Sequence, residues 1–181
     1  MSKILLLVVE NRDDIRLEYT KLLVDLAWNR LVSGVTFWGN QRRSIWYMRK
    51  TMIENALNSN KNFTHILFVD TDTIPPEGFI EKLSAHNVDM VSGYYCDTDG
   101  RPMTRKHGVS FLGKGLEEVD IFGMGCSLVK REVFEKVPYP EPTEPYKFDA
   151  DVEWCKACQE AGYKIYVDFN LRASHLLVGM F

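Results

Sequence analysis

The sequence predicts a single-domain α/β fold, with a mainly parallel central sheet flanked by helices and a small antiparallel, edge-strand part. In the first half of the chain, short apolar runs alternate with segments of helical periodicity, which is typical of right-handed βαβ units. After Tyr95 this alternation stops, and turn residues with short apolar stretches indicate antiparallel or edge strands. A chain of 181 residues, 45% of them hydrophobic, is long enough for one solid core and too short for two large domains.

Four strands are expected in the first half, because each is a short run of apolar residues bounded by polar or turn residues. The first run, 4–9, is apolar at every position, which is typical of a strand covered on both faces. The other three strands are expected at 31–37, 65–69 and 90–95. Later in the chain, shorter strands are expected at 109–112, 119–122 and 164–167.

Apolar residues at three- and four-residue spacing predict helices over 15–26 and 45–57. A third helix is expected to open at Pro75-Pro76-Glu77, since proline is favoured at the first helical position. A last helix is expected at 149–161, with Gly162 ending it. It carries Cys155 and Cys158 in mid-helix on one face, which indicates packing and not a redox motif.

Composition excludes several classes of protein. Lys and Arg total 22 against 25 Asp and Glu, a formal charge of −3, so the chain has no general attraction to nucleic-acid phosphates. The longest early apolar run is far shorter than the roughly 20 residues of a membrane helix. No cleavage pattern of a signal peptide follows it. We therefore expect a cytoplasmic protein without a transmembrane segment and without a nucleic-acid partner.

Two carboxylates follow the third predicted strand. Asp70 and Asp72 end an apolar run, and open parallel sheets bind ligands beyond the carboxyl ends of their strands. In an extended segment the two side chains would point the same way, about 7 Å apart. Such oxygen ligands suit Mg²⁺ or Mn²⁺, which in turn hold diphosphate oxygens. The alternative is that the acids only begin the turn into the next helix.

Two further polar features have a plain explanation that we favour. A second Asp-Thr-Asp at 97–99 is followed at once by Gly100, so it indicates a turn. Arg42, Arg43 and Arg49 lie on or beside the second helix, where they would reach a diphosphate or form a solvated helix face. The solvated face is the favoured interpretation.

Three segments, in order, resemble glycosyltransferases of the GT-A fold, especially the large inverting family 2. They are 68–72 followed by 74–77, 122–134, and 149–155 running on through 161–168. The resemblance covers about 64–175, and it extends to the compact glycosyltransferases encoded by some viruses. It implies a Rossmann-like GT-A fold and one catalytic domain over 1–181, with a nucleotide-binding half at about 1–95 and an acceptor half at about 96–181.

The resemblance also implies roles for individual residues. Asp72 would be the main metal ligand, Asp70 would contact the ribose or the donor sugar as well as the metal, and His175 would reach back to the metal or the diphosphate. Asp151 would be the catalytic base, although Ala150 replaces the acid that often precedes it. Nucleotide and sugar contacts would come from two further pairs: Glu10 with Asn11, and Gly123 with Gly125.

Each of these roles has a simpler alternative. Asp151 is also the kind of acid that the dipole of a helix favours in its first turn. His175 would otherwise be a core or surface histidine, and Glu10 a capping or solvated residue. Gly123 and Gly125 would otherwise serve only a tight turn.

The activity that the resemblance implies is transfer of a sugar, a hexose in the first instance, from a UDP- or GDP-sugar to a hydroxyl of a glycan or protein. Mn²⁺ or Mg²⁺ would be the cofactor, and the anomeric carbon would invert. If the chain is viral, the host cytoplasm is the expected location. The apolar finish at 176–181 indicates packing, self-association or a missing tail.

Three other functions stay open at this point. A phosphoacceptor receiver module has a similar acid cluster, formed here by Glu10, Asp13, Asp14 and Asp70, although no Lys-Pro pair ends a fifth strand. A nucleotidyltransferase shares the sheet and the metal chemistry, although the glycine-rich loop expected after its first strand is absent. A catalytically idle carbohydrate-binding or structural protein is the third alternative.

Overall fold

A seven-stranded sheet forms the centre of the molecule, in the order β2-β1-β3-β10-β5-β11-β8. The computed structural model describes residues 3–10, 21, 24–39, 44–59, 62–97, 99–141 and 150–175. Within these ranges the strands of the sheet are β1 (Ile4–Glu10), β2 (Val32–Gly39), β3 (His65–Asp70), β5 (Met90–Tyr94), β8 (Leu116–Val119), β10 (Cys126–Lys130) and β11 (Ile165–Arg172).

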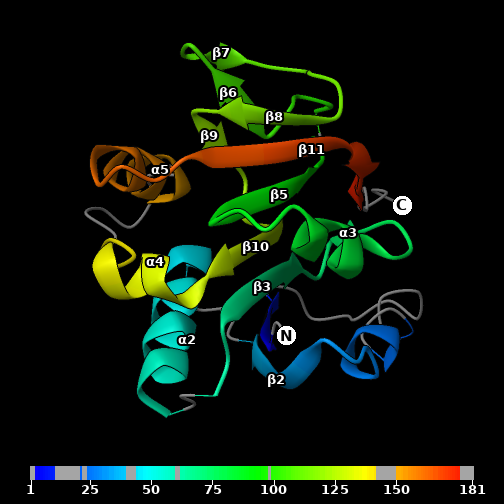
Figure 1. Cartoon of the computed structure of the whole chain (residues 1–181), viewed down its shortest axis with the longest axis vertical. Coiled ribbons are helices and arrows are strands. Elements are labelled where there is room, and N and C mark those ends of the chain that lie inside the picture. Colours follow the sequence, from blue (N-terminus) through cyan, green and yellow to red (C-terminus); the bar gives the residue numbers. More distant parts are fainter. Residues whose placement is uncertain are drawn as a thin grey trace.

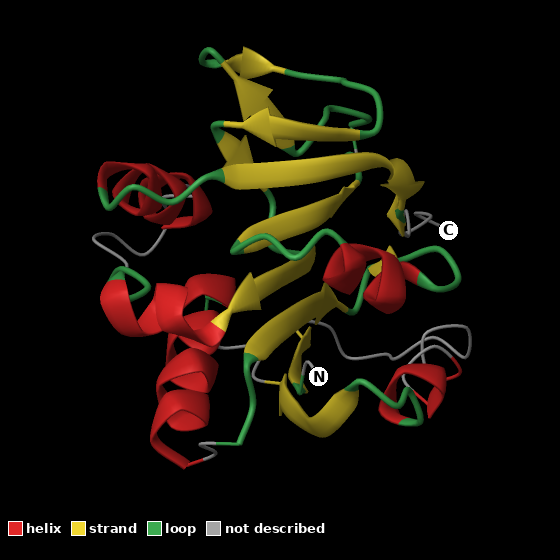
Figure 2. Cartoon of the chain, viewed as in Figure 1, coloured by secondary structure: helices red, strands yellow, loops and turns green. Residues whose placement is uncertain are grey.

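Most of these strands run in one direction. β1 is parallel to both β2 and β3, and β11 is parallel to β5. β10 lies antiparallel between β3 and β5, so those two strands share a direction, whereas β8 is antiparallel to β11 at the edge. Figure 2 shows the strands as one layer with helices beside it. The predicted fold class, a mainly parallel sheet flanked by helices, is confirmed.

Helices cover both faces of the sheet. In β1, Leu5 and Leu7 face the core that contains α2 (Ile45–Ser59), α4 (Arg131–Lys136) and α5 (Ala150–Glu160). Ile4, Leu6 and Val8 face the opposite core, with α3 (Phe79–Ala85) and the helical residues 24–27. In Figure 1 α2, α4 and α5 lie on one side of the strands and α3 on the other. Because successive side chains of a strand alternate, an all-apolar run satisfies both layers.

The short strands between residues 104 and 122 pair antiparallel, as expected. A three-stranded sheet in the order β7-β6-β9 is formed by β6 (Thr104–Lys106), β7 (Val109–Ser110) and β9 (Ile121–Phe122). It lies at the end of the molecule that carries β8, with β6 and β7 farthest from β11 (Figure 1). A two-stranded sheet joins β4 (Thr73–Ile74) to β12 (Ser174–His175), which brings the end of the described chain back to the segment after β3.

Several elements differ from the sequence prediction. The helix expected at Pro75 begins only at Phe79, after Gly78 in the left-handed region at φ 70°. The delay has a physical reason: Thr73 and Ile74 are held extended by pairing with β12, and a residue before proline disfavours helix. The strand β10 and the short helix α4 were not predicted. Most of the helix expected at 15–26 lies outside the described residues, of which 24–27 are helical.

One edge of the sheet collects the carboxyl ends of β1, β3, β5 and β11. β10 runs the other way, so its first residue, Cys126, is opposite Val69 at the same edge. The turn before β10 therefore lies beside the end of β3, where the sequence places its carboxylates. In the described part of the chain, no helix combines the length and the apolar character that a membrane span requires.

Candidate active site

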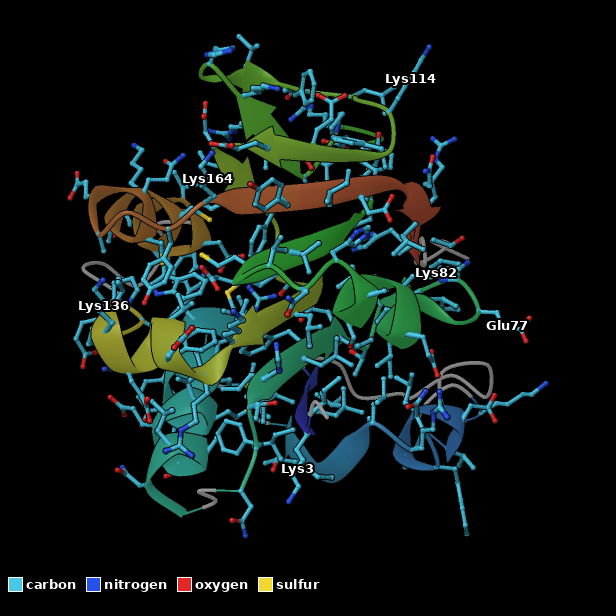
Figure 3. The ribbon with its side chains drawn as sticks, in the orientation of Figure 1. Lys3, Glu77, Lys82, Lys114, Lys136 and Lys164 are labelled. Carbon is cyan, nitrogen blue, oxygen red and sulfur yellow. The ribbon has the colours of Figure 1, made fainter. Side chains whose placement is uncertain are left out.

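The candidate site lies at this edge and is built around a buried arginine. The six charged residues labelled in Figure 3, among them Lys114, Lys136 and Lys164, extend outward from the molecule. Arg49, on α2, differs from these exposed side chains, because only 3% of the residue is exposed to solvent. Charged side chains are almost never so buried unless they are paired.

Arg49 pairs with two carboxylates that are distant from each other in sequence. Its Nη2 donates to Oδ2 of Asp70 at 2.6 Å. Its Nη1 donates to Oδ1 and Oδ2 of Asp151, at 3.1 and 2.9 Å. Asp70 is the last residue of β3, and Asp151 lies in the first turn of α5. One guanidinium thus brings together two of the acids that the sequence analysis singled out.

Asp151 accepts two further hydrogen bonds. The hydroxyl of Tyr139 donates to Oδ1 at 2.6 Å, and the backbone N–H of Met124 donates to Oδ2 at 3.4 Å. The Met124 contact is long and weak by the usual geometric standard. Among the hydrogen bonds to Asp151, the one from Met124 to Oδ2 is therefore the easiest for an incoming hydroxyl to replace.

The turn at 123–125 packs directly against Asp70. The carbonyl of Gly125 accepts the backbone N–H of Asp70 at 3.0 Å, and its own N–H donates to the hydroxyl of Tyr95 at 2.9 Å. A Cβ at Gly125 would come within 2.8 Å of Asp70 Oδ2, and a Cβ at Gly123 would meet the Tyr95 hydroxyl. The space beside both glycines is thus occupied by the chain's own side chains.

Burial changes the protonation chemistry of the site. Burial raises the pKa of Asp70. Like-charge repulsion from Asp72 and Asp151 raises this pKa further, and the positive charge of Arg49 lowers it. Oδ1 of Asp70 is buried and makes no hydrogen bond within the described ranges. A buried oxygen in this state favours a ligand that supplies a proton or a positive charge.

Two tyrosines line the acid cluster. Burial and the nearby carboxylates raise the pKa of both Tyr95 and Tyr139 well above the usual value for tyrosine. Both therefore keep their hydroxyl protons at neutral pH. Tyr139 uses its proton to donate to Asp151.

Asp72 acts on Asp70 by like-charge repulsion and also pairs with His175. His175 Nε2 is 3.4 Å from Asp72 Oδ1, and β12 places His175 opposite Thr73. The imidazole also stacks on the Tyr95 ring, with centroids 6.3 Å apart and an interplanar angle of 16°. Tyr95 therefore links the Asp72–His175 pair to the turn that contacts Asp70.

The expectation that Asp70 and Asp72 project side by side from an extended strand is wrong. β3 ends at Asp70, and residues 71 and 72 form a turn. The pairing with β1 stops at Asp70, and the chain is next extended in β4, where it pairs with β12. The alternation of an extended strand therefore does not apply to Asp72.

The residues at Asp72 fit a divalent cation that is shared with a ligand. The described residues contain no group of three His, Cys, Asp or Glu side chains that would hold a metal alone. A carboxylate and an imidazole are nevertheless donors that Mn²⁺ accepts, and cations at phosphate sites commonly take only one or two protein ligands. Asp72 and His175 match a phosphate site in which the protein supplies only one or two ligands to the cation. The unbonded oxygen of Asp70 is close to Asp72 in sequence.

Other predicted site residues are described only in part. Glu10 ends β1 opposite Gly39, but the description of Glu10 does not extend to its side chain. Asn11, Arg42 and Arg43 lie outside the described residues. The solvated-face interpretation of Arg49 is wrong, because its side chain is buried between the two acids.

Sequence analysis did not single out Tyr95 and Tyr139 as site residues, and it considered Arg49 only as a less favoured contact to a diphosphate. A signal existed for Arg49, which lies four residues after Ile45 and three before Met52, on the apolar stripe of its helix. A charge on such a stripe needs a buried partner. Tyr95 follows β5 directly, at the sheet edge where polar ligands bind. Nothing in the local sequence distinguishes Tyr139.

The fold is the GT-A-like fold of glycosyltransferase catalytic domains, and solved structures match nearly the whole chain. A197 from STIV aligns with a TM-score of 0.76 and 20% identity, over 97% of this chain and 86% of that one. GalNAc-T7, solved with UDP, GalNAc and Mn²⁺, aligns with a TM-score of 0.63 and 12% identity, over 97% of this chain and 44% of that one.

A third match is the catalytic domain of Drosophila β1,4-galactosyltransferase 7, solved in complex with xylobiose. It aligns with a TM-score of 0.60 and 14% identity, over 94% of this chain and 66% of that one. This chain thus spans less than half the length of GalNAc-T7 and about two thirds of the Drosophila domain. No family model and no curated protein matches the sequence.

Proposed function

We propose that this chain is a glycosyltransferase that transfers a sugar from a nucleoside diphosphate sugar to an acceptor hydroxyl, with inversion at the anomeric carbon. The observation that carries the proposal is the junction of Asp70 and Asp151 on Arg49, at the edge of a GT-A-like sheet. In this proposal Asp70 faces the sugar donor and Asp151 faces the acceptor, so each reactant meets one carboxylate. The likeness of the fold to solved glycosyltransferases supports the general class of enzyme, and the inversion is part of the proposal.

Asp151 is the proposed general base. The acceptor hydroxyl donates to Oδ2 in place of the long Met124 contact and gives up its proton as its oxygen attacks the anomeric carbon. The bond from that carbon to the diphosphate breaks, and the nucleoside diphosphate leaves with the electron pair. General-base assistance of this kind contributes about 10²–10⁴-fold. Attack from the face opposite the leaving group accounts for inversion.

Asp70 is the proposed contact to the sugar donor. Its unbonded Oδ1 accepts a hydrogen bond from a hydroxyl of the donor sugar or of the ribose. This bond gives a partner to a buried oxygen that otherwise has none within the described ranges. Backbone groups at Gly123 and Gly125, and Glu10 with Asn11 at the end of β1, are the proposed remaining contacts. Residues 1–95 would then hold the nucleotide and residues 96–181 the acceptor, in one catalytic domain.

Asp72 and His175 are the proposed holders of Mn²⁺ or Mg²⁺. When bound, the cation supplies positive charge to the diphosphate, whose negative charge grows as it leaves. The part of this chain is to hold two ligands close together, with His175 in β12 paired to Thr73, the residue that follows Asp72. His175 is fixed further by its stacking on Tyr95.

The fold argues against the receiver alternative. The order β2-β1-β3 begins like the doubly wound order of such modules, but the next strand, β10, is antiparallel. Acetyl phosphate is therefore not expected to label Asp70. The nucleotidyltransferase alternative is distinguished from a glycosyltransferase by its product, because it would release pyrophosphate and not a nucleoside diphosphate.

The decisive experiment is a calorimetric and product panel. UDP- and GDP-sugars are titrated into the protein with Mn²⁺, and those that bind are incubated with glycan and peptide acceptors. The expected result is metal-dependent binding of one nucleotide sugar, followed by release of a nucleoside diphosphate and a product of inverted configuration. Binding of no nucleotide sugar would favour the carbohydrate-binding alternative. Release of pyrophosphate would contradict the proposal.

A further inference from the structure

We infer that Arg49 is a positioning residue, whose guanidinium sets the spacing and orientation of the Asp70 and Asp151 carboxylates. The inference rests on the proposed function, because it assigns Asp70 to the sugar donor and Asp151 to the acceptor. Arg49 itself touches neither substrate in this scheme. It acts through the two acids.

The geometry of the contacts supports this role. Asp70 is bound through Nη2 and Asp151 through Nη1, so the two acids lie on different nitrogens of one planar group. A guanidinium holds its N–H groups in fixed directions, whereas the ammonium of lysine is a compact charge on a flexible stem. The separation of the two carboxylates is therefore fixed by the width of the group.

Arg49 is itself held firmly. The guanidinium emerges from a helix whose neighbouring residues Met48, Met52 and Ile53 are buried, and its side chain is only 4% exposed. The hydroxyl of Tyr139 fixes Asp151 from a second direction. Asp70 is anchored at its backbone by Gly125. Each part of the junction is thus held by burial or by hydrogen bonds, as a positioning role requires.

The rival explanation is that Arg49 only neutralises two buried negative charges. Lysine would serve that purpose equally well, because it also carries one positive charge. A positioning role needs the planar group, so lysine would restore the charge and lose the alignment. A third explanation is that Arg49 turns to bind the diphosphate of the sugar donor. Those three roles make different predictions for Arg49→Lys.

The test compares wild type, Arg49→Lys and a matched control, Arg131→Lys. Arg131 lies in α4, where its guanidinium sits over Phe63 and bonds Glu135. Each protein is assayed for kcat, for KM of donor and acceptor, for donor affinity by calorimetry and for its thermal midpoint. We expect Arg49→Lys to bind the donor within about threefold of wild type while kcat falls about 100-fold, the loss typical of a misplacement near 1 Å. Arg131→Lys should match wild type in kcat, in KM and in donor affinity.

The outcomes are distinguishable. Unchanged kcat in Arg49→Lys would show that charge is sufficient and would overturn the inference. A large loss of donor affinity would make Arg49 a donor-binding residue and would also overturn it. If wild type itself transfers no sugar, the proposed function fails and the inference falls with it.

A second measurement needs no variant and therefore does not depend on Arg49→Lys folding. A crystal structure of wild type with the nucleoside diphosphate and Mn²⁺ should keep Arg49 on both Asp70 and Asp151. A guanidinium turned away from Asp151 onto the diphosphate would contradict the positioning role. A guanidinium that stays between the two acids would support it.

Discussion

Arg49 and Asp151 are 102 positions apart in sequence, yet one guanidinium nitrogen, Nη1, donates to both carboxylate oxygens of Asp151. The contact joins the helix that precedes β3 to the first turn of α5. Breaking a buried ion pair by removal of one partner typically costs about 3–5 kcal/mol. Removal of either partner would therefore destabilise the fold as well as disrupt the candidate site.

Asp151→Asn should abolish most sugar transfer. The amide keeps the size of the side chain, and its oxygen still accepts from Tyr139, but it cannot take up a proton. We expect kcat to fall about 10²–10⁴-fold, with donor affinity nearly unchanged. Release of nucleoside diphosphate and calorimetric titration of the donor measure the two effects.

Glu153→Gln is the matched control for that variant. Glu153 lies in the same first turn of α5 but is exposed. If acids in this turn served only the helix dipole, the two variants would behave alike, each losing about 0.3–1 kcal/mol of stability and no activity. Full activity in Asp151→Asn would remove Asp151 as the base.

Most of the sheet could be predicted from the sequence because its strands are apolar runs with few polar interruptions. β10 was missed, since it is short and contains Ser127, whose buried hydroxyl donates to the carbonyl of Met124. The late start of α3 was also missed. It depends on β12, a strand 100 residues further along, and no local pattern reveals such pairing.

The candidate site was predictable to the extent that its acids follow strands or open helices. Asp70 was expected directly after the third strand and is the last residue of β3, where it shares one guanidinium with Asp151. The partner that joins them was not identified, because Arg49 looks like one of several basic residues near the start of a helix. Only its position on the apolar stripe separates it from Arg42 and Arg43.

Gly123→Ala should destabilise the protein through a specific steric conflict. The added Cβ would meet the hydroxyl of Tyr95, and it would lie 2.9 Å from the ring carbon Cζ. Overpacking of this kind costs about 1–3 kcal/mol. Urea unfolding measures the free energy of unfolding of the variant and of wild type.

Tyr95→Phe in the same chain tests the cause of that loss. Alone, it removes the acceptor of the Gly125 N–H and should cost about 1 kcal/mol. Combined with Gly123→Ala, it removes the oxygen that the new methyl group meets, so the double variant should be more stable than the sum of the two losses predicts. Strict additivity would show that the hydroxyl is not the obstacle.

Thiol reactivity should separate one cysteine from the other three. Burial raises the pKa of Cys126 and of Cys158 to about 12, and it raises the pKa of Cys155 as well. At pH 8 a thiol with such a pKa is ionised to about one part in ten thousand, and the thiolate is the reactive form. Cys96 is only half-buried. Ellman's reagent should therefore modify one thiol quickly in the native protein and four in denaturant.

Cys96→Ser is the control for this assignment, since it should remove the fast thiol and leave the other three slow. Raising the pH should speed modification of the buried thiols, because below the pKa each added pH unit raises the thiolate fraction about tenfold. Rapid modification of Cys155 or Cys158 would contradict their assignment as packing residues of α5. It would reopen a redox role for the pair.

Chelation should stop turnover, and the effect should depend on the Asp72–His175 pair. With EDTA we expect no release of nucleoside diphosphate, and added Mn²⁺ should restore it. His175→Ala should raise the Mn²⁺ concentration for half-maximal rate about tenfold or more, because it removes a group 3.4 Å from Asp72. His65→Ala is the matched control, since His65 begins β3 at the end opposite Asp70. Turnover that persists in EDTA would exclude a metal role for Asp72, while an equal effect of both histidine variants would exclude His175 as a specific ligand.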